Sequence, residues 1–363
     1  MFEDIISLIK PLDNAAMDRC QLRLDNLTKP LGSLHSFEHI ARQMAGITGN
    51  PRPKKLEKSV ILMAGDHGVA DEGVSAYPKE VTAQMVQNFC QGGAAINVFA
   101  EHIGARLVLV DIGVAADLSQ LTNIHQEKIA CGTKNIAKEP AMTREQTQQA
   151  IETGIKIAQG EAFKGSRVIG LGEMGIANTT PSTAIVACYS KKTLEELTGR
   201  GTGISDEILD RKVSVLKRAI EVNSPDKNDP IDVLSKVGGF EIAGLVGVIL
   251  GAASSGAAVV LDGLITSAAA LIAVKIAPQV KDYLVGSHFS VEPAHAEVLE
   301  VIGVPAYLKL DMRLGEGTGA VLGMSLINAS LHVINDMKTF GEAEVAVAQD
   351  GPGALRQSKD VKD

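Results

Sequence analysis

The sequence repeats one pattern six times: a short apolar run ends in glycine or a polar residue, and a stretch of helical character follows. The runs cover residues 60–64, 107–110, 167–169, 258–261, 283–285 and 307–310. Continuous apolar strands that alternate with helices are typical of a parallel sheet covered on both faces. Because the carboxyl ends of parallel strands lie at one edge of the sheet, we expect the polar residues after these runs to converge on one cleft. The pattern therefore predicts an α/β fold with its ligand site at that edge.

The last run leads into a glycine-rich turn at residues 312–319, in which Glu316 stands between two glycines and a helix is expected from Thr318. Glycines permit positive φ and a close approach to a ligand, so this turn would hold Glu316 at the cleft. A glutamate that only caps a helix would show the same local pattern. The similar character of the other five strand ends favours a functional carboxylate.

Residues 170–175 contain Gly-x-Gly-x-x-Gly, the spacing of a dinucleotide-binding loop placed after a strand and before a helix. The acidic residue that should follow about 20 positions later falls within residues 191–197, which have helical or loop character, and this disfavours NAD. The glycines still suit a phosphate or an anionic ring held by backbone N–H groups. Thr180, followed by Pro181, predicts the start of the next helix.

A second glycine-rich loop spans residues 199–203, and Ser205 is expected to cap the helix that follows. Lys212 lies one to two turns into that helix. The segment alone is compatible with a capped surface helix, or with a flexible anion-binding loop for which Lys212 supplies the opposite charge. The sequence pattern leaves both interpretations open.

Composition excludes several classes of protein. The 363 residues are 45% hydrophobic and 21% charged, which predicts a packed core. The net charge of -8 argues against nucleic acid and anionic membrane as main partners. The four cysteines show no metal-ligand spacing, and we expect buried free thiols in a reducing compartment.

Two further features bear on location. Residues 242–261 carry no charge and are long enough to cross a bilayer, but Ser254, Ser255 and Gly256 interrupt them, so we predict a buried helix followed by a buried strand. The first residues show no basic segment before their apolar positions, which is not typical of a signal peptide. We therefore expect a cytoplasmic protein.

Six segments, in a fixed order, carry a resemblance to a known family. They are residues 65–74 (GDHGVADEGV), 172–181 (GEMGIANTTP), 232–240 (DVLSKVGGF), 261–263 (LDG), 287–290 (SHFS) and 313–317 (RLGEG). They closely resemble nicotinate-nucleotide:dimethylbenzimidazole phosphoribosyltransferases of cobalamin lower-ligand assembly. The similarity runs from residue 29 to about residue 340.

The resemblance implies an activity and an architecture. Nicotinate mononucleotide would donate its phosphoribosyl group to dimethylbenzimidazole or a related base, giving α-ribazole phosphate and nicotinate, without a cofactor or metal. It also implies a homodimer. Residues 41–324 would form a large Rossmann-like domain, and residues 1–40 with about 325–348 a small helical domain; Asp13 is expected to cap a helix in the first of these segments. Residues 349–363 are predicted to be a flexible tail.

The resemblance also implies roles for individual residues. Glu316 would be the general base, with Glu173 and Lys212 also in the catalytic site. The pyridinium of the donor becomes neutral as it leaves, so one base that accepts the acceptor's N–H proton suffices. The expected substrate-binding residues are Tyr77, Gln84, Met85, Gly175, Asn178, Gly201, Asp262, Ser290, Leu314 and Gly315.

The segment expected to line the base pocket departs from the family pattern. Tyr77 stands where compared members carry serine, and Met85 stands where they carry glutamine. Gln84 is adjacent, but neighbouring residues on a helix face directions about 100° apart. The preferred acceptor base therefore stays open.

The sequence leaves two other functions as alternatives. An NAD-dependent oxidoreductase would rest on the Gly-x-Gly-x-x-Gly spacing alone. A non-catalytic nucleotide-binding protein would require Glu316 to be no more than a helix cap.

Overall fold

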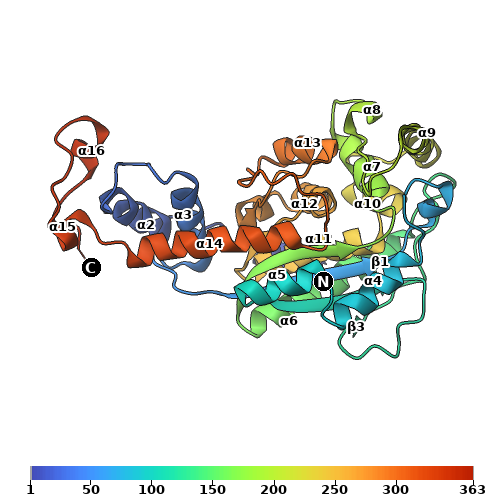
Figure 1. The fold of residues 1–363 in the computed structure, drawn as a ribbon, viewed down its shortest axis with the longest axis horizontal. Helices are drawn as coiled ribbons and strands as arrows, with labels where there is room; N and C mark the ends of the chain where they lie inside the picture. The colour runs from blue at the N-terminus through green and yellow to red at the C-terminus, as the bar shows by residue number, and fades with distance from the viewer. Residues whose placement is uncertain (1, 363) are drawn as a thin grey trace.

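The computed structural model describes residues 2–362 and shows a parallel six-stranded sheet packed between helices (Figure 1). The strand order is β3-β2-β1-β4-β5-β6, and every neighbouring pair is parallel. The strands are β1 (Glu57–Gly65), β2 (Arg106–Gly113), β3 (His125–Gln126), β4 (Ser166–Met174), β5 (Ala258–Val260) and β6 (Leu284–Val285). The predicted α/β fold is confirmed.

One of the six predicted strands is wrong. Residues 307–310 form no strand of the sheet, and Leu308 makes only an isolated bridge to His288. The sixth strand is instead His125–Gln126 at the opposite edge, which is exposed and too short and polar to resemble the repeated pattern. An apolar run of this length is therefore not enough to identify a strand.

Both faces of the sheet are buried at β1, β4, β5 and β6, which explains the continuous apolar runs in these strands. On one side of β1, Val60 lies against the glycine turn that precedes α14 (Thr318–Asp336). On the other side, Met63 contacts Gly244 of α11 (Phe240–Ser254). The core of the protein is therefore continuous through the sheet.

Helices α11 and α6 (Arg144–Phe163) pack closely through a stripe of small residues. A Cβ at Gly247 would lie 1.9 Å from the carbonyl oxygen of Ile151, so only glycine permits this approach. The stripe at Gly244, Gly247 and Gly251 is therefore used within the chain and offers no surface to a second copy. The charge-free segment 242–261 forms α11 and β5, as predicted, and among residues 2–362 no helix is long and apolar enough to cross a membrane.

A smaller helical part lies at one end of the molecule, where N- and C-terminal segments meet (Figure 1). It contains α2 (Asn14–Asn26), α3 (Ser36–Thr48) and the C-terminal half of α14, which share a separate apolar cluster. Asp13 caps α2 by accepting the N–H of Ala16 at 2.9 Å, as predicted. The proposed boundary at residues 324–325 falls inside α14, so the two parts share one helix.

The segment at 349–363, expected to be a flexible tail, packs against this helical part as far as it is described. It contains the short helix α16 (Gly351–Arg356). Gln357 is buried and its Nε2 donates to the carbonyl of Lys29 at 3.2 Å, while the N–H of Ser358 donates to Asn26 at 2.6 Å. These contacts had no local signal in the polar sequence.

The remaining elements complete the layers around the sheet. They are α1 (Phe2–Leu8), η1 (Gly68–Glu72), α4 (Val81–Cys90), α5 (Ala95–Ile103), α7 (Thr179–Tyr189), α8 (Leu194–Leu197), α9 (Asp206–Asn223), α10 (Pro230–Val237), α12 (Leu264–Ile276), η2 (Pro278–Tyr283), α13 (Pro293–Ile302) and α15 (Phe340–Ala343). All four cysteines are free thiols; Cys20 is buried as expected, whereas Cys131 is exposed.

Candidate active site

A cavity of about 370 Å³ opens at the carboxyl ends of β4, β5 and β6. Its lining includes residues that follow these three strands, together with the turn that precedes α14. The residues at the tips of β1 and β2 do not line the cavity. His67 is hydrogen-bonded to Glu241 at 2.6 Å, and Asp111 forms an ion pair with Lys128 at 3.3 Å. The predicted convergence on one cleft is therefore correct for three strand ends and wrong for two.

Glu316 occupies a strained turn at this cavity. Its φ is +62°, between Gly315 at +85° and Gly317 at +92°, in a region that side-chain-bearing residues rarely adopt. The side chain is buried, and Oε2 accepts the N–H of Ile96 at the start of α5 at 3.3 Å. Burial raises the pKa of Glu316, and the negative charge of Asp262 acts in the same direction. The result is a carboxylate suited to accepting a proton closer to neutral pH.

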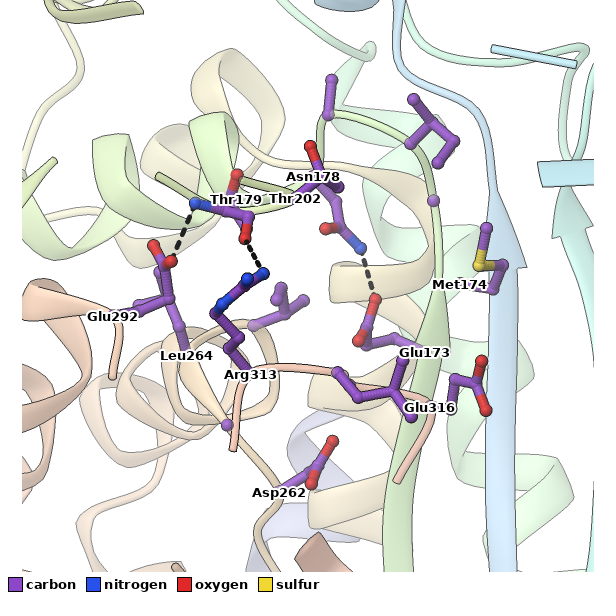
Figure 2. Close-up of a pocket in the computed structure, with 18 of the residues that line it drawn as sticks. Glu173, Met174, Asn178, Thr179, Thr202, Asp262, Leu264, Glu292, Arg313 and Glu316 are labelled. Atoms are coloured by element: carbon purple, nitrogen blue, oxygen red, sulfur yellow. Dashed lines mark hydrogen bonds between the residues drawn. The ribbon is translucent and has the colours of Figure 1, made fainter. Parts of the chain in front are cut away.

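Glu173 lies beside Glu316, near the end of β4 (Figure 2). Burial raises the pKa of Glu173 to about 8, and the charges of Asp262 and Glu241 add to this effect. The amide of Asn178, at the start of α7, donates to the Glu173 carboxyl. A carboxyl with this pKa is largely protonated at pH 7, so the two neighbouring glutamates need not both be charged.

Lys212 could be a surface residue by its sequence, but the structure buries it. It lies on α9, is only 1% exposed, and donates to Thr179 Oγ1 at 2.7 Å and to the carbonyl of Gly199 at 3.3 Å. Burial lowers its pKa to about 8, and the charge of Glu292 opposes this shift. The capped surface helix is therefore wrong for this residue, although Ser205 does cap α9. Lys212 lies behind the cavity lining and supports it through Thr179 and Gly199.

Two residues that the sequence analysis gave no role hold the loop at residues 199–203 in place. The N–H of Gly201 donates to Glu292 at 2.8 Å, and its carbonyl accepts from Arg313 at 3.2 Å (Figure 2). Glu292 is buried at the N-cap position of α13 and makes no side-chain cap there. The glycine-rich loop is thus tied to both sides of the cavity.

Most of the residues predicted from the sequence come together. Those that line the cavity are Tyr77, Glu173, Gly175, Asn178, Gly201, Asp262, Ser290, Leu314, Gly315, Glu316 and Met85. Gln84 does not: it is exposed on α4, one helical step from Met85, and does not line the cavity. Tyr77 is 53% exposed and lies at the rim.

The Gly-x-Gly-x-x-Gly spacing has a structural cause that differs from a dinucleotide loop. Gly170 and Gly172 lie inside β4 rather than after it. A Cβ at Gly172 would lie 2.6 Å from the carbonyl oxygen of Glu316. These glycines therefore allow the turn at Glu316 and the helix α14 to pack on the strand. The helix that follows begins one residue before Thr180, with Asn178 as its N-cap.

The N-termini of α7 and α12 both border the cavity, and neither has a side-chain cap. The positive end of a helix dipole favours anions. With buried carboxyl groups at the same edge of the sheet, the fold and the site define an α/β protein whose cavity suits a small anionic ligand.

Comparisons with known proteins identify the family. Residues 9–345 match the family model described as Phosphoribosyltransferase. A nicotinate-nucleotide–dimethylbenzimidazole phosphoribosyltransferase from Dehalococcoides mccartyi is 52% identical over 344 residues, which are 95% of this chain and 98% of the relative. A protein of the same name from Geobacter metallireducens is 49% identical over 96% of this chain and 99% of its own. The chain belongs to this phosphoribosyltransferase family.

Solved structures agree with this assignment. The crystal structure of CobT from Thermus thermophilus is similar with a TM-score of 0.88 and 40% sequence identity. The match covers 92% of this chain and 99% of that one. The shared architecture therefore extends over most of this chain and nearly all of the solved one.

Proposed function

We propose that this protein transfers the phosphoribosyl group of nicotinate mononucleotide to dimethylbenzimidazole or a related base, giving α-ribazole phosphate and nicotinate. The observation that carries the proposal is the buried carboxylate of Glu316 on its strained turn, at a cavity of a chain about half identical to enzymes of that name. The oxidoreductase alternative loses its basis, because Gly170 and Gly172 lie within a strand.

The chemistry needs one base at this site. One nitrogen of the acceptor attacks the anomeric carbon, the bond to nicotinate breaks, and the pyridinium takes the bonding electron pair and becomes neutral. The other nitrogen of the acceptor loses its proton, and Glu316 accepts it. The raised pKa of Glu316 brings its proton affinity closer to that required near neutral pH. Glu173, largely protonated at pH 7, adds little negative charge beside it.

The substrate groups are proposed to divide between two parts of the cavity. Gly175 and Ser290, with the N-termini of α7 and α12, would hold phosphate and ribose, since backbone N–H groups suit anions. Gly201, whose own N–H donates to Glu292, would border these groups. The apolar side chains at the other part, Met85 and Leu314, would contact the acceptor base. Tyr77 would border that base from the rim.

Lys212 is proposed to act on the donor site through the loop at residues 199–203, because its ammonium contacts the carbonyl of Gly199 and the hydroxyl of Thr179. A homodimer in the cytoplasm stays part of the proposal. It is supported by the family resemblance alone, and light scattering at micromolar concentration would test the dimer.

Incubation with nicotinate mononucleotide and dimethylbenzimidazole, with nicotinate release followed by chromatography, tests the reaction. Glu316→Gln keeps the size of the side chain but removes the proton acceptor. Turnover should fall by about 10²–10⁴, the usual contribution of a general base, while the KM for the donor changes little. Glu101→Gln, at an exposed position on α5, is the matched control and should retain full activity. A Glu316→Gln enzyme within a few-fold of wild type would show that another group is the base.

A further inference from the structure

Asp262 follows β5 and was expected to bind substrate, but both of its carboxylate oxygens are engaged by the protein. Oδ2 accepts the N–H of Gly317 at 3.0 Å, and Oδ1 accepts the N–H of Gly319 at 2.7 Å. The residue is only 2% exposed. Its polar atoms are therefore directed at the start of α14 rather than being left for a ligand.

These two hydrogen bonds lie at the beginning of α14, directly after Glu316. The first N–H groups of a helix have no partner within it, and a side chain at the N-cap normally supplies one. The N-cap of α14 is Gly317, which has no side chain. Asp262 supplies the missing acceptor from the segment that follows β5, 55 positions earlier in the chain.

From this geometry we infer that Asp262 is a positioning residue: its carboxylate fixes the glycine turn so that Glu316 presents its own carboxylate to the acceptor base. The inference rests on the proposed function of Glu316. The turn needs such a fixing group, because three consecutive residues have positive φ and Glu316 bears a steric cost there that its glycine neighbours do not.

Asp262 is itself held firmly, as a positioning residue must be. Its N–H donates to Thr266 Oγ1 at 2.9 Å, and its carbonyl accepts from Ser287 Oγ at 3.3 Å. A Cβ on Gly319 would lie 2.6 Å from Oδ1 of Asp262 and 2.0 Å from Nδ1 of His288. Only glycine at that position lets the helix start come so close to the carboxylate.

Several charged or polar groups face Glu316, and they influence the pKa that the pH profile of the rate would show. Glu173 lies across Gly315, Asp262 lies under the turn with His288 next to it, and the N-terminus of α5 donates through Ile96. The charge of Asp262 raises the pKa of Glu316. Removal of that charge should therefore lower the pKa of Glu316 and move the acid limb of the rate profile to lower pH.

Asp262→Asn tests the inference, because an asparagine oxygen can accept only one of the two N–H groups and its NH₂ would face the other. We expect kcat to fall by about tenfold to a hundredfold, as for a misplacement of a reacting group by roughly 1 Å. The KM for nicotinate mononucleotide should stay nearly constant. The acid limb of the kcat profile should shift to lower pH.

Asp111→Asn is the matched control. Asp111 is also a buried carboxylate near the end of a strand, and it accepts the N–H of Val114 at 2.9 Å, but it lies outside the cavity. This variant should lose stability in urea unfolding and keep both kcat and the pH profile. If Asp262→Asn loses activity only in proportion to its unfolded fraction, as a purely structural change would, the inference is wrong.

Two other outcomes are decisive. A raised donor KM with unchanged kcat would return Asp262 to the substrate-binding role. If wild-type enzyme releases no nicotinate, the proposed function fails, and the positioning inference is then tested without turnover by titrating the Glu316 carboxyl with ¹³C-glutamate NMR. A lower pKa of Glu316 in Asp262→Asn than in wild type would support the coupling, and an identical pKa would overturn it.

Discussion

Gly172→Ala should impair the reaction although it alters no side chain that is proposed to take part in it. Gly172 lies in β4, where an alanine backbone is unstrained, and its neighbour across the packing interface is the carbonyl oxygen of Glu316. A Cβ at this position would stand 2.6 Å from that oxygen and 3.1 Å from the carbonyl carbon. Both are backbone atoms, which cannot rotate away as the end of a flexible side chain can.

The geometry sets the size of the effect. An ordinary contact of a Cβ begins near 3.4 Å, so the Glu316 turn and the strand must separate by roughly 0.8 Å. Overpacking of this kind costs about 1–3 kcal/mol of stability. A displacement of a catalytic group by roughly 1 Å can lower the rate by about 10²-fold, so we expect kcat to fall by about ten- to a hundredfold.

The assay is nicotinate release at saturating donor and acceptor, with the folded fraction measured in parallel by urea unfolding. Gly170→Ala is the matched control: it lies two residues earlier on the same strand, and its nearest contact would be the flexible end of Met324 at 2.7 Å. It should lose some stability but keep kcat. Equal kcat values for the two variants would refute the link between β4 packing and the position of Glu316.

Three further predictions follow from burial and charge. Lys212→Met removes a charge-assisted contact of about 1.5–3 kcal/mol, so it should slow turnover or raise the donor KM by about ten- to a hundredfold. Lys217→Met, at an exposed position on the same helix, should change neither. Tyr77→Ser should change the ranking of benzimidazole, adenine and phenolic acceptors in competition assays; an unchanged ranking would remove Tyr77 from the base site. Burial lowers the pKa of His295 to about 4, so as the pH falls the unfolded chain protonates this histidine before the folded chain does. The free energy of unfolding should therefore decrease as the pH drops from about 6.5 to 4, by up to about 3 kcal/mol. Urea unfolding at pH 7.5 and 4.5 would show this loss in wild type and a smaller one in His295→Gln.

The sequence was informative wherever the physical cause was local. Continuous apolar runs, separated by helical stretches, correctly predicted five strands, because a strand buried on both faces must be apolar throughout. Asp13 and Ser205 were recognised as caps, because the group that accepts each helix N–H is close in sequence. Glu316 was found because its glycine neighbours reveal a turn with unusual backbone angles.

Features that depend on distant segments gave no such signal. Lys212 resembles any charged residue on a helix, and its burial comes from contacts with Thr179 and the loop carbonyl of Gly199. Asp262 lines the cavity, but its hydrogen bonds to the start of α14 depend on how the end of β5 and that helix meet. Gly172 fits the spacing of a nucleotide-binding loop, but in the structure it allows the turn at Glu316 to pack closely on β4. Both a ligand-binding loop and a close packing contact require glycine, so the sequence does not distinguish them.

Helix α14 connects the turn at Glu316 to the small helical part at the far end of the molecule. Its first turn follows Glu316, and its last turns enter the small helical part, where Arg23 of α2 donates to the carbonyl of Ile334 at 2.9 Å. Nineteen residues at 1.5 Å each make a rod of roughly 28 Å. Truncation of either chain terminus would therefore loosen the anchored end of α14, whose first turn follows Glu316, and the terminal helices are not a detachable module.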